Sequence, residues 1–296
     1  MDIKFGEYSM EDNVSFAVIG GSGLYSMPGL NDVKELDLNT PFGKPSSPLI
    51  LGTLEGRRIA FLARHGIGHH ISPTDVNYRA NIFALKMVGT SQVVSISACG
   101  SLKEEYAPGH IVFPDQLFDF THLRSRSFFG KGLVAHIGAA DPFCSEWSNL
   151  VCENVQKTGA TVHGGGTLIT IEGPRFSTKA ESNIFRTWGF SIIGMTASPE
   201  AFLAREAEMC YTTMAHVTDY DVWHTSMEPV TVDMVIKTLN QNTRIAQDGI
   251  RNLALSFKER TSCSCQNALS SALITNPEAV DPGTKEKLSL LVKKYM

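Results

Sequence analysis

Short apolar runs rich in β-branched residues recur along the chain, and each run is bounded by glycine, proline or polar residues. Runs of this length and composition are typical of buried β-strands. They predict strands at residues 16–20, 57–63, 92–97, 110–114, 166–172 and 210–218.

Segments with apolar residues at helical spacing lie between these runs. They predict helices at residues 80–89, 146–159 and 198–210, followed by a long amphipathic helix at 232–255. Ser198 and Pro199 suit the N-cap and the first turn of the helix that they open. The alternation of strands and helices indicates an α/β protein with a mainly parallel or mixed sheet.

The 296 residues are 43% hydrophobic and 19% charged, an ordinary globular composition that can form one large core. We expect one domain, because no repeat or long linker divides the chain. The net charge of -4 comes without a basic stripe, which argues against a nucleic-acid polymer as partner. No apolar run approaches the roughly 18 residues of a membrane span, and no signal-peptide core is present. We therefore expect a soluble intracellular protein with no membrane partner.

Six cysteines occur without regular spacing, mostly inside apolar stretches, and buried reduced thiols are the favoured interpretation. Cys263 and Cys265 differ because they lie one residue apart in a polar segment. They could pair under oxidation or bind a metal. We favour neither, because the cytosol is reducing and the sequence shows no second cysteine pair to complete a zinc site.

Three of the predicted strands run into residues suited to binding a small anion. The first ends in Gly-Gly-Ser-Gly at 20–23, the second in Arg64 and His65, and the third in Ser-Ala-Cys-Gly-Ser at 97–101. Glycines let backbone amides approach an anion, and the guanidinium fork matches phosphate oxygens. Because the carboxyl ends of parallel strands meet at one edge of a sheet, these residues predict a shared phosphate site.

Histidines cluster after the second strand, at His65, His69 and His70. Imidazoles are common metal ligands, but no nearby cysteine or carboxylate completes a ligand set. We therefore expect no metal here.

Eight short motifs occur in one order along the chain. They are GGSGLY (20–25), TPFGKPS (40–46), ARHG (63–66), NYRANIFALK (77–86), ACGSL (98–102), IEGPRFST (171–178), GMTASPE (194–200) and TDYDVW (218–223). Together they resemble the 5′-methylthioadenosine phosphorylase branch of the trimeric nucleoside phosphorylase family, over about residues 15–255. The resemblance implies a single-domain nucleoside phosphorylase fold over 15–296, with a central mixed twisted sheet flanked by helices. An extension at 1–14 and a tail at 257–296 match the family poorly.

The resemblance also implies roles for individual residues. The phosphate site would comprise Ser22, Arg64, His65, Ser97, Ala98 and Thr196. In the nucleoside site, Met195 would lie under the ribose, Phe176 would stack on the base, and Ser177 and Glu172 would line the purine pocket. An apolar slot for the 5′ group would be formed by Val232 and His69, with His136 reaching in from a neighbouring subunit of a homotrimer.

Three positions depart from the family pattern. Serine stands at 22 and 97, where this branch often has threonine, and Gly194 replaces an asparagine. Serine keeps the hydroxyl donor and lacks a methyl group, so we expect altered phosphate affinity with unchanged chemistry. Loss of the asparagine removes one polar contact near the base.

Asp219 and Asp221 follow the strand at 210–218, so both emerge where α/β proteins bind ligands. Adenine presents the N7 acceptor and the 6-amino donor on one edge. A protonated Asp219 could donate to N7 as the general acid while Asp221 accepts from the amino group. An ordinary turn or helix cap is the alternative, and the DYD triplet alone does not exclude it.

These observations favour reversible phosphorolysis of 5′-methylthioadenosine to adenine and 5-methylthioribose-1-phosphate. Inorganic phosphate would be the co-substrate, and no cofactor is expected. A broader phosphorylase acting on adenosine or 6-oxopurine nucleosides and a non-catalytic nucleotide sensor are the alternatives. The expected location is the cytoplasm, with the nucleus as a second location.

Overall fold

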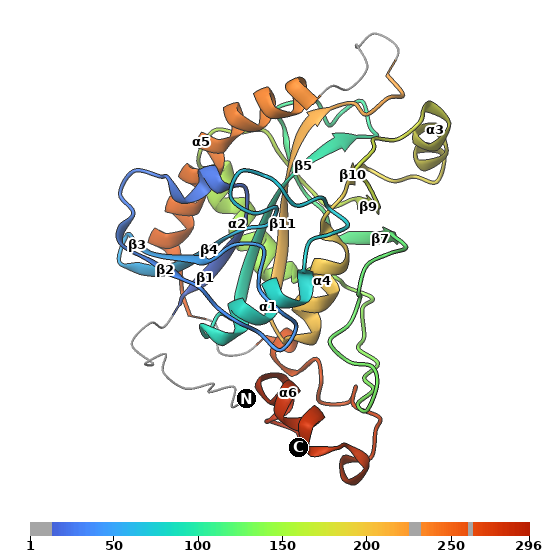
Figure 1. Ribbon diagram of the computed structural model, residues 1–296. Coiled ribbons are helices and arrows are strands. Elements are labelled where there is room, and N and C mark those ends of the chain that lie inside the picture. Colours follow the sequence, from blue (N-terminus) through green and yellow to red (C-terminus); the bar gives the residue numbers. More distant parts are fainter. Residues whose placement is uncertain (1–13, 225–231, 260–262) are drawn as a thin grey trace.

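The computed structural model describes residues 14–224, 232–259 and 263–296, without the side chains of 22, 25, 232 and 234–241 (Figure 1). Its strands are β1 (Phe16–Gly20), β2 (Asn31–Leu36), β3 (Leu49–Leu54), β4 (Arg57–Ala63), β5 (Gln92–Ser101), β6 (Ile111–Phe113), β7 (Gln116–Phe120), β8 (Val162–Gly164), β9 (Thr167–Ile171), β10 (Ile192–Gly194) and β11 (Cys210–Asp219). Its helices are α1 (Tyr78–Met87), α2 (Ser145–Gln156), α3 (Lys179–Thr187), α4 (Ala197–Glu206), α5 (Val232–Ser256) and α6 (Pro282–Val292), and short 3-10 turns lie at Ser22–Tyr25, Ser264–Asn267 and Pro277–Ala279.

The strands form one mixed sheet, as the sequence predicts. The main path runs β2-β3-β4-β1-β5-β10-β9-β7, and β11 pairs with β5 and β6 off this path. β4, β1, β5 and β11 are parallel neighbours, whereas β10 runs antiparallel to β5. The carboxyl ends of four parallel strands therefore meet at one edge of the sheet.

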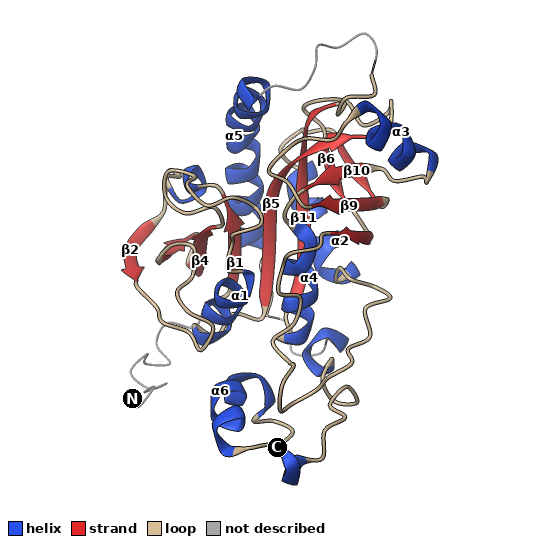
Figure 2. Ribbon diagram, turned by 45° about the vertical axis from the view of Figure 1, so that its right-hand side comes forward, coloured by secondary structure: helices blue, strands red, loops and turns tan. Residues whose placement is uncertain are grey.

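Helices cover both faces of this sheet. Figure 1 shows α1 and α4 in front of it and α2 and α5 behind it. The secondary-structure view in Figure 2 shows α5 lying alongside the long central strands. α1 and α4 pack into one apolar core, and α2 and α5 pack into a second one. β11 contributes side chains to both cores, because it is buried along its whole length.

Some elements were not predicted because their residues do not carry an apolar signal. In β2 five of six residues are exposed, and in α3 only Ser182 and Phe185 are buried. The expected start of the helix at Ser198 and Pro199 fits the backbone. Ser198 is extended, with φ -102° and ψ 135°, so regular helix begins after it.

The carboxyl-terminal segment is part of the domain. Leu269, Leu288 and Leu291 are buried in the same core as α1 and α4. Figure 1 shows this segment below the sheet, at the end where β11 begins. The predicted extension at 1–14 lies, apart from Val14, outside the described residues. No described helix has both the length and the apolarity that crossing a bilayer requires.

Candidate active site

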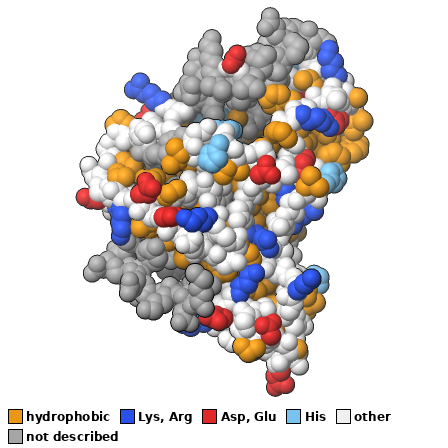
Figure 3. All heavy atoms as spheres, in the orientation of Figure 1, with side chains coloured by type: hydrophobic (Ala, Val, Ile, Leu, Met, Phe, Trp, Pro, Cys, Tyr) orange, Lys and Arg blue, Asp and Glu red, His pale blue; other side chains and the backbone are white. Residues whose placement is uncertain are grey.

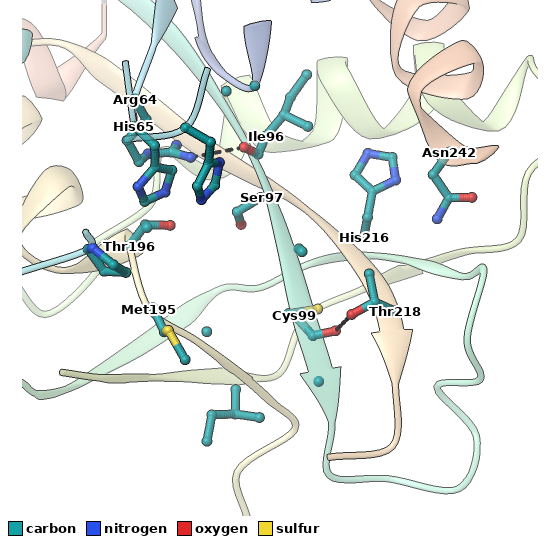
Figure 4. Close-up of a pocket in the computed structure, with 18 of the residues that line it drawn as sticks. Arg64, His65, Ile96, Ser97, Cys99, Met195, Thr196, His216, Thr218 and Asn242 are labelled. Carbon is teal, nitrogen blue, oxygen red and sulfur yellow. Dashed lines mark hydrogen bonds between the residues drawn. The ribbon is translucent and has the colours of Figure 1, made fainter. Parts of the chain in front are cut away.

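A cavity of about 610 Å³ opens at the carboxyl ends of β1, β4, β5 and β11 (Figure 4). This volume lies within the range of small-molecule sites. Eleven of the residues singled out from the sequence line it: Arg64, His65, His69, Ser97, Ala98, Phe176, Ser177, Met195, Thr196, Asp219 and Asp221. The fold thus brings together the predicted phosphate, sugar and base residues from strands far apart in the chain.

Four predicted residues are not among those lining this cavity. The side chains of Ser22 and Val232 lie outside the described part of the structure. His136 is exposed, and its backbone amide donates to Ala272 O at 2.8 Å. Glu172 lines a smaller neighbouring pocket.

Arg64 directly follows β4, and Glu200 of α4 binds its guanidinium on the side away from the cavity. Its Nε and Nη2 donate to the Glu200 carboxylate at 2.8 and 2.9 Å, and both side chains are buried. Nη2 also donates to Ser95 Oγ at 2.6 Å, and Nη1 donates to Ile96 O at 3.1 Å. Of the five guanidinium hydrogens, one on Nη1 is left without an acceptor among the described residues. The guanidinium fork is therefore engaged by Glu200, and phosphate would receive a single N–H.

Glu200 was missed by the sequence analysis, although it lies within the GMTASPE motif. Its Oε1 accepts from Arg64, from Ser95 Oγ at 2.8 Å and from Tyr211 Oη at 2.8 Å. A fully buried carboxylate with these donors fixes the arginine in one orientation. The sequence offered only the position of Glu200 in the first turn of a predicted helix, where acids are common.

His65 follows Arg64 and is neutral. Its Nδ1 lies 2.9 Å from Ile71 O, and its ring stacks on His69 with centroids 4.4 Å apart. Burial and the positive charge of Arg64 lower the pKa of His65 to about 4. Because a carbonyl only accepts, Nδ1 carries the proton and Nε2 is an acceptor.

Thr196 lies just before α4, and its hydroxyl makes no capping hydrogen bond to the helix. The loop around it is fixed by Arg124, whose Nη1 donates to Met195 O at 2.6 Å and to Ser198 O at 2.7 Å. Arg124 also was not singled out from the sequence. It acts on the site through the backbone that it holds.

Glu172 is tied into the same framework. Its carboxylate accepts from the backbone amides of His122 and Leu123 and from Arg124 Nε, the last at 3.0 Å. Burial opposes ionisation, but these donors prevail and lower the pKa of Glu172 to about 2. This carboxylate thus anchors the loop beside the cavity, and its contact with a purine stays a prediction of the resemblance.

Asp219 and Asp221 are both buried in the cavity wall at the end of β11. Asp219 accepts from Thr218 Oγ1 at 2.6 Å and from the Asp221 amide at 2.7 Å. Burial raises the pKa of Asp219, and the charge of Asp221 raises it further, against those hydrogen bonds. Burial also raises the pKa of Asp221. Two carboxyls with raised pKa values in one cavity are suited to holding and moving a proton.

β5 sets the distance between the two ends of the cavity. Its Ile96 carbonyl binds Arg64, and a Cβ placed on Gly100 would lie 3.0 Å from Asp219 Oδ1. Gly100 lies four positions after Ile96 along the strand, a separation of about 13 Å at roughly 3.3 Å per residue. A cationic end and an acidic end are thus separated by about the length of a nucleoside.

His216 and Asn242 line the cavity near each other (Figure 4) and were not expected from the sequence. Both ring nitrogens of His216 and Nδ2 of Asn242 are buried without a hydrogen-bond partner among the described residues. Burial lowers the pKa of His216 to about 4, so the ring is neutral. These polar groups are available to a ligand.

Comparison with known proteins agrees with this geometry. The family model described as "Phosphorylase superfamily" matches residues 15–253. The S-methyl-5′-thioadenosine phosphorylase of Koribacter versatilis is 51% identical over 94% of this chain and 95% of its own length. The enzyme of that name from Geobacter sulfurreducens is also 51% identical, over 94% of this chain and 98% of its own length.

Solved structures give the same result. A methylthioadenosine phosphorylase from an antarctic soil metagenomic library superimposes with a TM-score of 0.91 and 43% identity, covering 95% of this chain and 99% of that one. The methylthioadenosine phosphorylase of Schistosoma mansoni in complex with tubercidin has a TM-score of 0.80 and 34% identity, covering 87% of this chain and 96% of that one. With the fold, the cavity and these likenesses in agreement, the chain belongs to the phosphorylase superfamily and, within it, to the S-methyl-5′-thioadenosine phosphorylase family.

Proposed function

We propose that the protein catalyses the reversible phosphorolysis of S-methyl-5′-thioadenosine to adenine and 5-methylthioribose-1-phosphate, without a cofactor. The observation that carries this proposal is a single cavity with Arg64 at one end and the Asp219–Asp221 pair at the other. The names of the relatives from K. versatilis and G. sulfurreducens support the choice of substrate.

The acid pair serves the leaving base. A protonated Asp219 donates to purine N7, so that the base leaves without a negative charge. Asp221 accepts from the 6-amino group. Burial raises the pKa of Asp219, which keeps it protonated closer to neutral pH than an exposed aspartate. A 6-oxopurine would place a carbonyl oxygen against the Asp221 carboxylate, so inosine should be a poor substrate.

The other end of the cavity serves the phosphate. Arg64 supplies positive charge and one N–H, and the hydroxyls of Ser97 and Thr196 add neutral donors. His65 Nε2 accepts from the P–OH of hydrogen phosphate, because its Nδ1 proton is committed to Ile71 O. Phosphate held here lies beside the sugar carbon on which positive charge develops as the glycosidic bond breaks. Attraction between the two lowers the barrier.

The sugar and base lie between these ends. Met195 packs under the ribose, Phe176 stacks on the base, and Ser177 lies at the base edge. His69 and a neighbouring subunit's His136 would enclose the 5′ group. Val232, which the resemblance also assigns to this slot, has its side chain outside the described part of the structure.

Adenosine is a second candidate substrate, because of His216 and Asn242. A methylthio group is apolar, whereas these side chains offer buried polar atoms that have no hydrogen-bond partner in the described part of the chain. A 5′-hydroxyl within their reach would be bound by a hydrogen bond that methylthioadenosine lacks. Comparing kcat/KM for the two nucleosides in the parent and in His216→Leu separates the candidates: only adenosine turnover should fall if the histidine reads a hydroxyl.

We also propose a homotrimer in the cytoplasm. Phe118, Phe120, Ile184 and Trp188 are large apolar side chains that are 36% to 56% exposed. Figure 3 shows hydrophobic side chains gathered at the upper right, over α3 and β7. Such a patch is suited to contact with a second copy of the chain. Light scattering in solution measures the molar mass and so tests the trimer. Cell fractionation or microscopy tests the cytoplasmic location, and a pool of the protein in the nucleus would be the alternative outcome.

The proposed reaction is tested by a substrate panel with and without phosphate. Adenine should be released from methylthioadenosine only when phosphate is present, and inosine should react more slowly. Equal release in phosphate-free buffer would identify a hydrolase, and a faster rate with inosine would overturn the substrate choice.

A further inference from the structure

Four cysteine sulfurs converge at the end of the sheet opposite the cavity. Cys144, Cys210, Cys263 and Cys265 are buried, and their Sγ atoms all lie within 4.8 Å of one another. They come from three distant parts of the chain: the N-cap of α2, the first residue of β11, and the segment after α5. Cys144 and Cys210 lie next to Cys263 and Cys265 only in the fold, so the sequence shows no second cysteine pair near them.

The spacing of these sulfurs fits a tetrahedral metal site. With zinc–sulfur bonds of about 2.3 Å, the sulfurs of a tetrahedral zinc site lie about 3.8 Å apart. The Sγ atoms of Cys144 and Cys263 are 3.7 Å apart. A disulfide would require about 2.05 Å, and all six cysteines of the chain are free thiols in the structure. Two disulfides would join the sulfurs in pairs, whereas mutual proximity of all four favours one central ion.

The surroundings fit a closed site. The cluster belongs to an apolar core that includes Trp147 and Phe257, so water has no place as a ligand. Four thiolates around a divalent ion leave a charge of about −2, which a nearby cation can offset. Arg205 supplies one, because its Nη1 donates to Cys265 Sγ at 3.4 Å. Cys144 also lies at the positive end of the α2 dipole.

We propose that Cys144, Cys210, Cys263 and Cys265 bind one structural zinc ion. Binding converts four thiols to thiolates and releases their four protons, with no change in oxidation state. The ion joins the carboxyl-terminal segment to β11 and to α2. It takes no part in the reaction, because Cys210 and Asp219 stand at opposite ends of β11, about 30 Å apart at roughly 3.3 Å per residue.

The first test is metal analysis of the full chain purified under reducing conditions without chelators. We expect about one zinc per chain, retained through gel filtration and released when an organic mercurial titrates the thiols. Cobalt bound in its place should give the near-ultraviolet sulfur-to-cobalt bands and visible bands of a tetrahedral thiolate site. These two readouts use the unmodified chain, so they do not depend on any variant folding.

Cys265→Ser provides the second test, with Cys152→Ser as the matched control. Cys152 lies on α2 outside the cluster. We expect Cys265→Ser to lose most of the zinc and to be cleaved faster by protease after α5, while Cys152→Ser keeps both zinc and resistance. Zinc well below one per chain with all thiols reduced would overturn the proposal. An intact mass lower than that of the reduced chain by two hydrogens per disulfide would also overturn it. So would a full equivalent of zinc bound to Cys265→Ser. None of these readouts uses phosphorolysis, so the two proposals fail separately.

Discussion

Thr218 Oγ1 donates to Asp219 Oδ2 at 2.6 Å while the Asp221 amide donates to Oδ1 at 2.7 Å, which fixes the plane of the buried Asp219 carboxyl. Both hydrogen bonds are local, because their donors, Thr218 and Asp221, lie within two residues of Asp219 in the TDYD stretch. An acid placed at the end of a strand is thereby held in one orientation toward the cavity.

Asp219→Asn removes the proposed acid while keeping the shape of the side chain. We expect kcat for methylthioadenosine to fall by about 100-fold or more, the usual size of a general-acid contribution. The melting temperature should change little. Asp37→Asn is the control, because Asp37 is exposed and, among the described residues, forms its ion pair with Lys44 at the surface. Unchanged turnover in Asp219→Asn would remove Asp219 from the acid role.

Gly100→Ala tests the close approach of β5 to the acid. A Cβ at Gly100 would lie 3.0 Å from Asp219 Oδ1 and 3.0 Å from Ile193 Cγ2, so the carboxyl has to shift. We expect kcat to fall at least several-fold with little loss of stability. Gly164→Ala is the matched control on β8, because its Cβ would meet nothing within 4 Å. Equal rates for the two variants would show that the position of the carboxyl does not matter.

Glu200→Gln leaves Arg64 buried without its counter-charge. Breaking one side of a buried ion pair costs about 3 kcal/mol or more of unfolding free energy. We also expect KM for phosphate to rise more than KM for the nucleoside, because the guanidinium loses its fixed orientation. Denaturant unfolding and initial rates measure the two effects. A variant as stable as the parent, with the same KM for phosphate, would refute this role.

Glu206 makes stability depend on pH. Burial raises its pKa to about 7, against hydrogen bonds from Ser127 and Phe128. The folded state therefore holds a proton that the unfolded state releases near pH 4.5, so this group's contribution to stability falls as pH rises from about 4.5 to about 7.

Glu206→Gln removes that titration. The stability of the parent relative to the variant should therefore decline by a few kcal/mol between pH 5 and pH 8. Comparing parent and variant is necessary because His65 and His216, whose pKa values burial lowers, act in the opposite direction. A constant difference across this range would contradict the raised pKa of Glu206.

The sequence was informative where a signal is local. Buried parallel strands carry apolar runs, so β1, β4 and β11 were predicted. The residues at or just beyond the carboxyl ends of β1, β4, β5 and β11 indicated the site. Exposed β2 and polar α3 carry no such signal. Glu200, 136 residues beyond Arg64, was missed because their pairing depends on the fold. The cysteine cluster and the His216–Asn242 wall were missed for the same reason.

The most direct test of the central claim is to follow methylthioadenosine and phosphate together by phosphorus NMR while adenine is measured by absorbance. The account predicts that inorganic phosphate disappears and a sugar-1-phosphate resonance grows in equal proportion to adenine. Adenine release with the phosphate signal unchanged, and free methylthioribose as the second product, would contradict it.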